Sequence, residues 1–316
     1  MIAHEVDGEL APAHLRGIAE QLAAEAADFV RRRRGEVFEA VRGDHGGQGN
    51  PVRAKSTPTD PVTIVDTETE RLLRDRLAEL RPADQVLGEE EGGSGPAQPG
   101  RPVWVLDPID GTVNFVYGLG AYAVSVGAQI DGVSVAGAVA NAATGELYSA
   151  ALGHGARLRR GDVSIMLRCN MIDDLSMALV ATGFSYDSTR RRLQGAVLAE
   201  LLPQVRDVRR VGSCALDLCM VAAGQLDAYY ESGVHVWDWA AGALIAAEAG
   251  AVLRLPPVGA SEATGGNIGA SEATGGDIGA SEATGNADSA VDDLIIAAAP
   301  GIADDLTGRL AQAGYR

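Results

Sequence analysis

A short apolar run, Val103-Trp104-Val105-Leu106, ends abruptly on the acidic residue Asp107. A continuous apolar run of this length predicts a fully buried strand. The residues Pro108-Ile109-Asp110-Gly111-Thr112 follow, so a second carboxylate lies just beyond the carboxyl end of that strand. Proteins that alternate strands and helices bind their ligands at this end of the strands. These residues therefore predict an α/β fold with an acidic ligand site after the strand.

Helical and strand patterns alternate along most of the chain. Expected helices span 13–33, 196–205, 215–223, 240–249 and 303–311. A further helix is capped by Thr63 or Asp66 and ended by Pro82. Expected strands span 103–106, 122–130, 133–139, 146–150, 178–182, 226–230, 252–255 and 294–298. This order predicts a layered sandwich with alternating helix and sheet layers. We expect one catalytic domain over 1–316, built from two packed lobes of about 12–165 and 166–316.

A repetitive segment at 259–288 separates the last two expected strands. The unit Gly259-Ala260-Ser261-Glu262-Ala263-Thr264-Gly265-Gly266-Asn267-Ile268 is followed by a near copy from Gly269 and a divergent third copy from Gly279. Three polar copies with so short a period bury almost no apolar surface. We expect a disordered decapeptide-repeat insert in a hairpin loop. A calcium-binding repeat is the alternative, but its acidic residues are poorly spaced.

The charge and composition of the chain limit its partners. A formal net charge of -17, from 26 basic and 43 acidic residues, disfavours nucleic acid as the main partner. A phosphorylated small molecule stays compatible with this charge if divalent cations lie between it and the protein. No window is apolar enough to span a membrane, and the start of the chain does not resemble a signal peptide. Three cysteines, an odd and sparse set, indicate a reducing cytoplasm.

The run from Asp107 to Thr112 supplies hard oxygen ligands of the kind that Mg²⁺ prefers. By itself it could be an ordinary turn with capping residues. Three further segments also place carboxylates next to apolar elements: Gly88-Glu89-Glu90, Trp237-Asp238-Trp239, and the region of Lys55, Asp60 and Asp66. If these were ordinary turns and caps, four separate segments would each place a carboxylate beside an apolar element by coincidence.

Taken together, these segments resemble the inositol monophosphatase family, and in particular its actinobacterial members. The resemblance covers about Leu15 to Leu310 without the repeat. It rests on the runs Leu87-Gly88-Glu89-Glu90, Trp104-Val105-Leu106-Asp107-Pro108-Ile109-Asp110-Gly111-Thr112-Val113-Asn114-Phe115 and Val236-Trp237-Asp238-Trp239-Ala240-Ala241-Gly242. It implies a fold like that of fructose-1,6-bisphosphatase and inositol monophosphatase.

The resemblance also implies a role for individual residues. Two to three Mg²⁺ ions would be held by Glu89, Asp107, the Ile109 carbonyl, Asp110 and Asp238. Catalysis would depend on Glu89, Asp110 and Thr112, with Thr112 paired to Glu89 to orient the attacking water. Substrate would contact Asp110, Gly111, Thr112, Gly212, Ser213, Cys214, Glu231 and Asp238. Lys55, Asp66 and Glu90 would support the metal ligands from behind. Glu91 adds an acid to the Glu89 run, so the choice of Glu89 depends on Gly88 preceding it.

The implied activity is Mg²⁺-dependent hydrolysis of inositol-1-phosphate, a phosphorylated polyol, by a metal-activated water. Inhibition by Li⁺ and a cytoplasmic homodimer are further implications. Fructose-1,6-bisphosphate, a 3′-phosphorylated nucleotide and histidinol phosphate are alternative substrates. A non-catalytic protein that keeps the fold and binds other macromolecules is an alternative of another class. No basic residue beside Cys214 lowers its pKa, so we interpret that cysteine as packing.

Overall fold

The computed structural model describes residues 8–43, 52–55, 61–93, 95, 97–256 and 293–315. Its α-helices are α1 (Pro12–Gly43), α2 (Ile64–Leu80), α3 (Thr112–Tyr117), α4 (Ser188–Leu201), α5 (Cys214–Ala222), α6 (Val236–Glu248) and α7 (Ala303–Ala313). Short 3₁₀ helices lie at Gly8–Leu10, Leu175–Met177 and Leu202–Gln204. Strands β1 (Val52–Ala54) and β2 (Pro61–Thr63) form a two-stranded ribbon.

The larger sheet contains the acidic strand predicted from the sequence. Its order is β10-β9-β8-β7-β6-β5-β3-β4. The strands span β3 (Gln85–Gly88), β4 (Gly92–Gly93), β5 (Pro102–Asp110), β6 (Ala123–Ile130), β7 (Val133–Asn141), β8 (Leu147–Ala151), β9 (Ala156–Arg160) and β10 (Val163–Met166). Only β3 and β5 pair in parallel within this sheet. Their carboxyl ends therefore lie side by side and bring Glu89 near Asp107.

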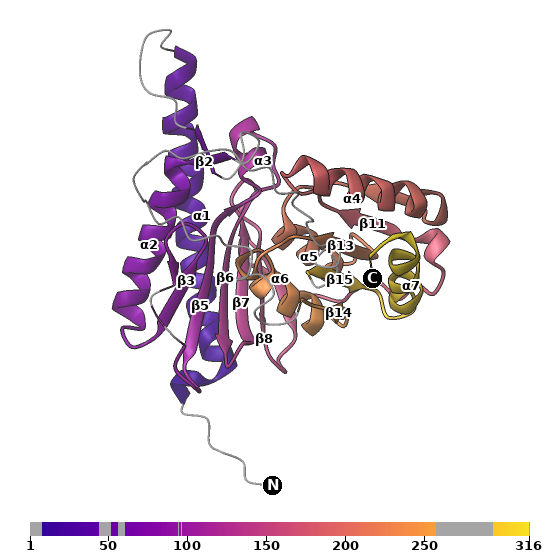
Figure 1. The fold of residues 1–316 in the computed structure, drawn as a ribbon. Coiled ribbons are helices and arrows are strands. Elements are labelled where there is room, and N and C mark those ends of the chain that lie inside the picture. The colour runs from indigo at the N-terminus through magenta and orange to yellow at the C-terminus, as the bar shows by residue number, and fades with distance from the viewer. Residues whose placement is uncertain are drawn as a thin grey trace, which may run out of the picture.

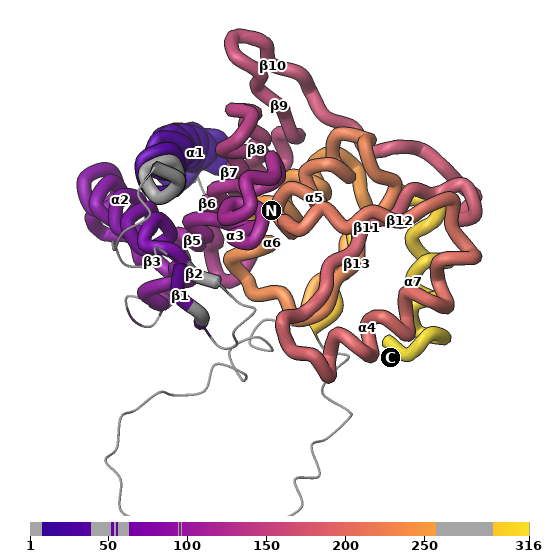
Figure 2. The backbone as a smooth tube through the Cα atoms, turned by 90° about the horizontal axis from the view of Figure 1, so that it is seen from above, coloured from indigo at the N-terminus to yellow at the C-terminus, as the bar shows by residue number. Residues whose placement is uncertain are grey.

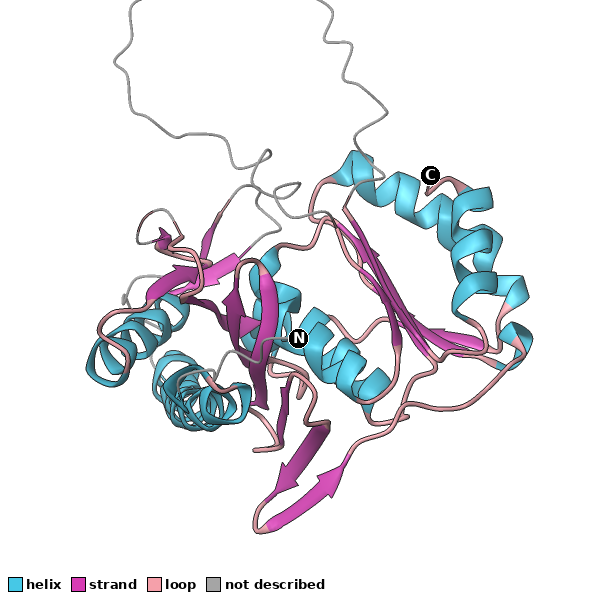
Figure 3. Ribbon diagram, turned by 90° about the horizontal axis from the view of Figure 1, so that it is seen from below, coloured by secondary structure: helices cyan, strands magenta, loops and turns pink. Residues whose placement is uncertain are grey.

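The smaller sheet has the order β12-β11-β13-β15-β14. Its strands span β11 (Leu179–Thr182), β12 (Asp207–Arg209), β13 (Ala228–Ser232), β14 (Val252–Arg254) and β15 (Leu294–Ala298). Helices α1 and α2 cover the outer face of the larger sheet, whereas α5 and α6 lie between the two sheets (Figure 1). Helices α4 and α7 cover the outer face of the smaller sheet (Figure 3). The expected layered α/β fold is therefore confirmed.

Close packing of α6 on the larger sheet positions its N-terminus at the site. Gly127 and Gly137 face Ala240 and Ala241, and a Cβ added at Gly137 would lie 2.8 Å from the Ala241 Cα. Larger residues in β6 and β7 would push the helix away from the sheet. The small residues on both surfaces therefore fix how near Asp238, in the first turn of α6, comes to β5.

Several boundaries differ from those predicted. Helix α4 begins at Ser188, where the Asp187 side chain caps it, and the chain continues as a 3₁₀ turn from Leu202 because Pro203 follows. The hairpin of β9 and β10 was not expected, and it extends away from the body of the protein (Figure 2). The 259–288 repeat lies outside the described residues. Within the described chain, no helix combines the length and apolar character needed to cross a membrane.

Candidate metal and phosphate site

The end of β5 brings Asp107 and Asp110 to the same cavity. The register with β6 shifts between these two residues, so the strand departs from regular pairing where the acidic residues lie. The Ile109 amide donates to Asp107 Oδ1 at 3.0 Å, which fixes that carboxylate against its own turn. Both aspartates are buried. A bulge at a strand end is a common way to direct a side chain into a site.

Gly111 makes the next turn, and its conformation requires glycine. Its φ is +90°, and an added Cβ would lie 2.8 Å from the Ala121 carbonyl oxygen and 3.1 Å from that of Gly212. The left-handed backbone and the lack of space both exclude a side chain. Helix α3 begins immediately afterwards at Thr112. The backbone N–H groups of this first turn have no partner within the helix and can donate to an oxyanion.

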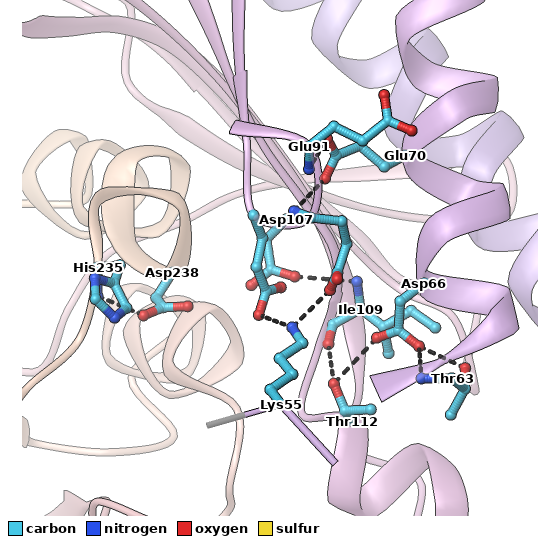
Figure 4. A network of polar contacts seen from close by, with 12 residues as sticks. Lys55, Thr63, Asp66, Glu70, Glu91, Asp107, Ile109, Thr112, His235 and Asp238 are labelled. Atoms are coloured by element: carbon cyan, nitrogen blue, oxygen red, sulfur yellow. Dashed lines mark hydrogen bonds and ion pairs between the residues drawn. The ribbon is translucent and has the colours of Figure 1, made fainter. Parts of the chain in front are cut away.

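The Thr112 hydroxyl has a partner that differs from the expected one. From the sequence we expect it beside Glu89, but it lies 3.3 Å from Asp66 Oδ1 and 3.0 Å from the Ile109 carbonyl oxygen (Figure 4). Asp66 is fixed in turn because its other oxygen accepts from the backbone and side chain of Thr63, the N-cap of α2. The difference arises because α2 starts directly beside the first residue of α3, a tertiary contact that no local pattern reveals.

Asp238 reaches the site from the opposite side of the cavity. It is the third residue of α6, and its Oδ2 accepts from the His235 amide at 2.6 Å, as a capping residue does. Ligand oxygens of Asp107, Asp110 and Asp238 all lie within 4.8 Å of one another. Three segments distant in sequence meet here, because Asp110 Oδ2 also accepts from Ser213 Oγ at 2.5 Å and from the Ala215 amide at 2.7 Å.

The three aspartates have strongly perturbed pKa values. Burial, followed by repulsion from Glu89 and the neighbouring aspartates, raises the pKa of Asp107 well above its usual range. Burial and the charge of Asp110 do the same for Asp238. Burial raises the pKa of Asp110 to about 7, although the bonds from Ser213 and Ala215 oppose this. Buried carboxylates held together without a paired cation fit a divalent cation with hard oxygen ligands, such as Mg²⁺.

Lys55 neutralises the acidic turn after β3. Its ammonium lies 2.6 Å from Glu89 Oε1 and 2.6 Å from Glu90 Oε1. Glu89 lines the same cavity as the three aspartates, but its carboxylate is not part of their close group. Burial and the charge of Glu89 raise the pKa of Glu90 to about 7, even though Lys55 opposes this. The sequence predicts Glu89 as a metal ligand, and the structure adds an internal counter-ion to it.

The cavity has a volume of about 450 Å³. The expected residues along its wall are Lys55, Glu89, Asp107, Ile109, Asp110, Gly111, Thr112, Gly212, Ser213, Cys214, Glu231 and Asp238. Asp66 and Glu90 lie behind this wall. Glu231 accepts from the Tyr229 hydroxyl at 2.7 Å, and burial raises its pKa. Burial and nearby carboxylates raise the pKa of Cys214 well above its usual range, so its thiol stays protonated.

The cavity also includes residues that we did not single out as ligand contacts. These are Phe184, Ser185, Tyr186, Asp187, Arg210, Ser232, Gly233, Val234, His235 and Trp237. The 184–187 loop follows the carboxyl end of β11, and that position alone is a signal for a ligand loop. The rings of His235 and Trp237 stack with centroids 4.7 Å apart beside Asp238.

Fold and cavity together define a layered α/β protein with a carboxylate site for divalent metal. Residues 12–302 match the Inositol monophosphatase family. The chain is 59% identical over 308 residues to the Inositol-1-monophosphatase of Mycobacterium leprae, covering 95% of this chain and 94% of that one. It is 57% identical to the Inositol-1-monophosphatase SuhB of Mycobacterium tuberculosis H37Rv, over 95% and 94% of the two chains. The solved structure of Mycobacterium tuberculosis SuhB superposes with a TM-score of 0.73 at 50% identity, covering 96% of this chain and 98% of that one. The chain therefore belongs to the inositol monophosphatase family, whose activity depends on metal.

Proposed function

We propose that this chain is a phosphoric monoester hydrolase that converts inositol-1-phosphate to inositol and phosphate. The observation that carries the proposal is the meeting of Asp107, Asp110 and Asp238 in one cavity with the first turn of α3. Full-length relatives with 57–59% identity that bear the name Inositol-1-monophosphatase support the choice of substrate. Carboxylates for metal and free backbone amides for phosphate are the two components that such hydrolysis needs.

We infer two to three Mg²⁺ ions from the resemblance to the family, and the close group of three aspartates supports a metal site here. Asp107, Glu89 and the Ile109 carbonyl would hold one ion, and Asp107, Asp110 and Asp238 a second. Glu89 would also hold a third, weaker ion, and Lys55 would compete with that ion for its carboxylate. Bound Mg²⁺ supplies charge neutralisation of the phosphate, a more acidic water and stabilisation of the leaving oxygen.

Thr112 would orient the attacking water. Its hydroxyl has Asp66 and the Ile109 carbonyl as acceptors, so donation in that direction leaves its lone pairs free to accept from a water molecule. Asp66 is in direct contact with Thr112 and is therefore a stronger candidate than Glu89 for the carboxylate that assists it. The backbone amides of Gly111 and Thr112 would donate to the phosphate oxygens.

The opposite wall would bind the polyol. Glu231 presents a half-buried carboxylate that can accept from substrate hydroxyls, and its orientation is fixed by Tyr229. The turn of Gly212, Ser213 and Cys214 lies next to it in the cavity and would contact the ring. A site built to accept hydroxyl hydrogen bonds discriminates strongly against substrates that lack them.

We further propose that the enzyme is a cytoplasmic homodimer inhibited by Li⁺. The sparse cysteines, all unpaired and buried, support a reducing compartment. Li⁺ inhibition and the dimer rest on the family alone. Light scattering that reports a monomer would exclude the dimer, and full activity at tens of millimolar Li⁺ (an order-of-magnitude dose) would exclude the inhibition.

A substrate panel tests the central proposal. Phosphate release should be measured from inositol-1-phosphate, fructose-1,6-bisphosphate, a 3′-phosphorylated nucleotide and histidinol phosphate, each with Mg²⁺ and with chelator. We expect the highest kcat/KM for inositol-1-phosphate and no turnover in chelator. Faster turnover of another substrate would redirect the assignment to that substrate. No Mg²⁺-dependent turnover of any would favour a binding protein instead.

A further inference from the structure

Glu70, in the second turn of α2, is a charged side chain with no exposed surface. It lies on the opposite side of the acidic turn from the cavity and is not among the residues that line it. A buried carboxylate is costly unless it is fully paired, so its partners indicate its role. All of those that the structure identifies lie on α2 itself or on the turn that follows β3.

The Glu70 carboxylate accepts two backbone hydrogen bonds from this turn. Its Oε2 accepts from the Glu90 amide at 2.7 Å, and its Oε1 accepts from the Glu91 amide at 3.0 Å (Figure 4). These two amides directly follow Glu89, the expected metal ligand. A carboxylate that accepts hydrogen bonds from two consecutive backbone amides fixes both the position and the direction of the backbone between them.

Arg74, one helical turn further along α2, completes the arrangement. Its guanidinium lies 2.8 Å from Glu70 Oε1, and it also donates to the Gly92 carbonyl oxygen at 2.5 Å. The pair therefore holds the turn at both its amides and its far end, where β4 begins. The ion pair also balances the charge that Glu70 brings into the interior.

The same contact leaves no space for a side chain at Gly88, the residue before Glu89. A Cβ added there would lie 2.2 Å from Glu70 Oε1 and 2.4 Å from the carboxyl carbon. The φ of Gly88 is not in the left-handed region, so backbone freedom does not explain the glycine. The space that a side chain would fill is taken by the Glu70 carboxylate.

We propose that Glu70 is a positioning residue that holds Glu89 in place for metal. It reaches the metal site only through the backbone of the Glu89–Glu91 turn and touches neither substrate nor ion. This inference rests on the proposed function, because it takes Glu89 as a ligand. Groups that orient metal ligands commonly contribute about ten- to hundredfold to metal affinity.

The experiment is Mg²⁺ binding to the full chain by titration calorimetry, together with activity as a function of Mg²⁺. In Glu70→Gln the amide keeps one acceptor oxygen, but its NH₂ group faces the second backbone N–H. We expect the Kd for Mg²⁺ to rise about tenfold or more, with kcat at saturating Mg²⁺ within about threefold of wild type. Glu68→Gln is the matched control, because Glu68 lies on the same helix and pairs with Arg33 without contacting the turn. Its Mg²⁺ affinity should be unchanged.

A double-mutant cycle tests the same contact from the other side. Gly88→Ala alone should weaken Mg²⁺ binding about as much as Glu70→Gln, because the new methyl group displaces the carboxylate. In a Glu70→Ala background the space is vacant, so the further effect of Gly88→Ala should shrink to less than about threefold. A shared contact predicts this non-additivity, and the Gly88→Ala variant tests the contact with the Glu70 side chain itself unchanged.

The outcomes separate this inference from the proposed function. Wild-type protein that neither binds Mg²⁺ nor releases phosphate would overturn the function and the inference with it. Wild-type protein that binds Mg²⁺ while Glu70→Gln binds it equally well would overturn the inference alone. Additive effects in the cycle, or a lower melting temperature for Glu70→Gln with unchanged Mg²⁺ affinity, would also overturn it, since they indicate a purely structural role.

Discussion

Two groups of carboxylates lie at the cavity and in the turn beside it, and they balance their charge differently. Asp107, Asp110 and Asp238 have no basic side chain paired to them within the described chain. Glu89 and Glu90, by contrast, share the ammonium of Lys55. The first group needs a cation from solution, whereas the second carries its own. We infer that the aspartates hold metal most tightly, and that an ion bound through Glu89 must compete with Lys55.

The largest effect should come from Asp107→Asn, which removes the carboxylate charge at the centre of the first group. Loss of several kcal/mol of charge stabilisation corresponds to about a thousandfold or greater fall in kcat/KM. The same change relieves repulsion, so in chelator the variant should melt at a higher temperature than wild type. Its Asn oxygen can keep the bond from the Ile109 amide. A variant that is less stable in chelator would contradict the unpaired character of the group.

The first group should also make metal-free stability fall as the pH rises. The folded-state pKa of Asp110 is raised to about 7, above that of an unfolded aspartate, so the folded chain binds more protons and stability is lost as the pH rises through that value. Burial lowers the pKa of His235, which contributes the opposite slope. We therefore compare melting curves of wild type and Asp110→Asn in chelator.

The difference between these two proteins isolates the aspartate. Between about pH 4 and about pH 7, that is between the ordinary pKa of an aspartate and the raised pKa of folded Asp110, wild type should lose stability relative to Asp110→Asn. Mg²⁺ binding needs deprotonated carboxylates, so its affinity for wild type should increase over the same range. If the stability of wild type minus that of Asp110→Asn is flat or rises with pH, the inference that the aspartates lack a paired cation is contradicted.

A smaller effect is expected from Lys55→Met, which removes the cation of the second group. Glu89 and Glu90 then lose their partner, and we expect the metal-free protein to lose about 1–3 kcal/mol of unfolding free energy. The rise in melting temperature on adding Mg²⁺ should become larger than in wild type. Arg71→Met is the control, because the pair of Arg71 on α2 with Glu91 of the same turn is exposed and should contribute less than about 1 kcal/mol. Equal losses in both variants would contradict the special role of Lys55.

The smallest effect should follow Cys214→Ala. The pKa of this thiol lies well above its usual range, so it adds no negative charge to the neighbouring aspartates. We expect KM for inositol-1-phosphate to change by less than about fivefold and the pH profile of kcat to stay unchanged. A pH profile that shifts on removal of the thiol would show that a thiolate belongs to the first group.

The sequence predicts those parts of the site that depend on strand ends. Local pattern places Asp107 and Asp110 at the end of a buried strand and Asp238 at the start of an apolar helix. The resemblance to the family then assigns all three to metal. The contact between Thr112 and Asp66 could not be foreseen, because it depends on how α2 and α3 pack. Lys55 is likewise recognisable as a nearby cation, but its shared bond to Glu89 and Glu90 is a property of the folded chain.

The fold shows the same limit. The spacing of apolar residues identifies most strands and helices, since burial on one or two faces leaves a periodic pattern in the sequence. Strand β10 has no buried face to leave such a pattern, because all four of its residues are exposed. Gly127 and Gly137 likewise resemble ordinary strand glycines until α6 is placed against them.

The position of Asp238 on α6 has a consequence for how the protein matures during synthesis. Glu89, Asp107 and Asp110 leave the ribosome long before Asp238, and the larger sheet is translated before α6 that must pack on it. A nascent chain therefore carries part of the ligand set but cannot yet hold metal as the finished enzyme does. A metal ion held by all three aspartates can therefore stabilise only chains in which α6 has packed on the larger sheet.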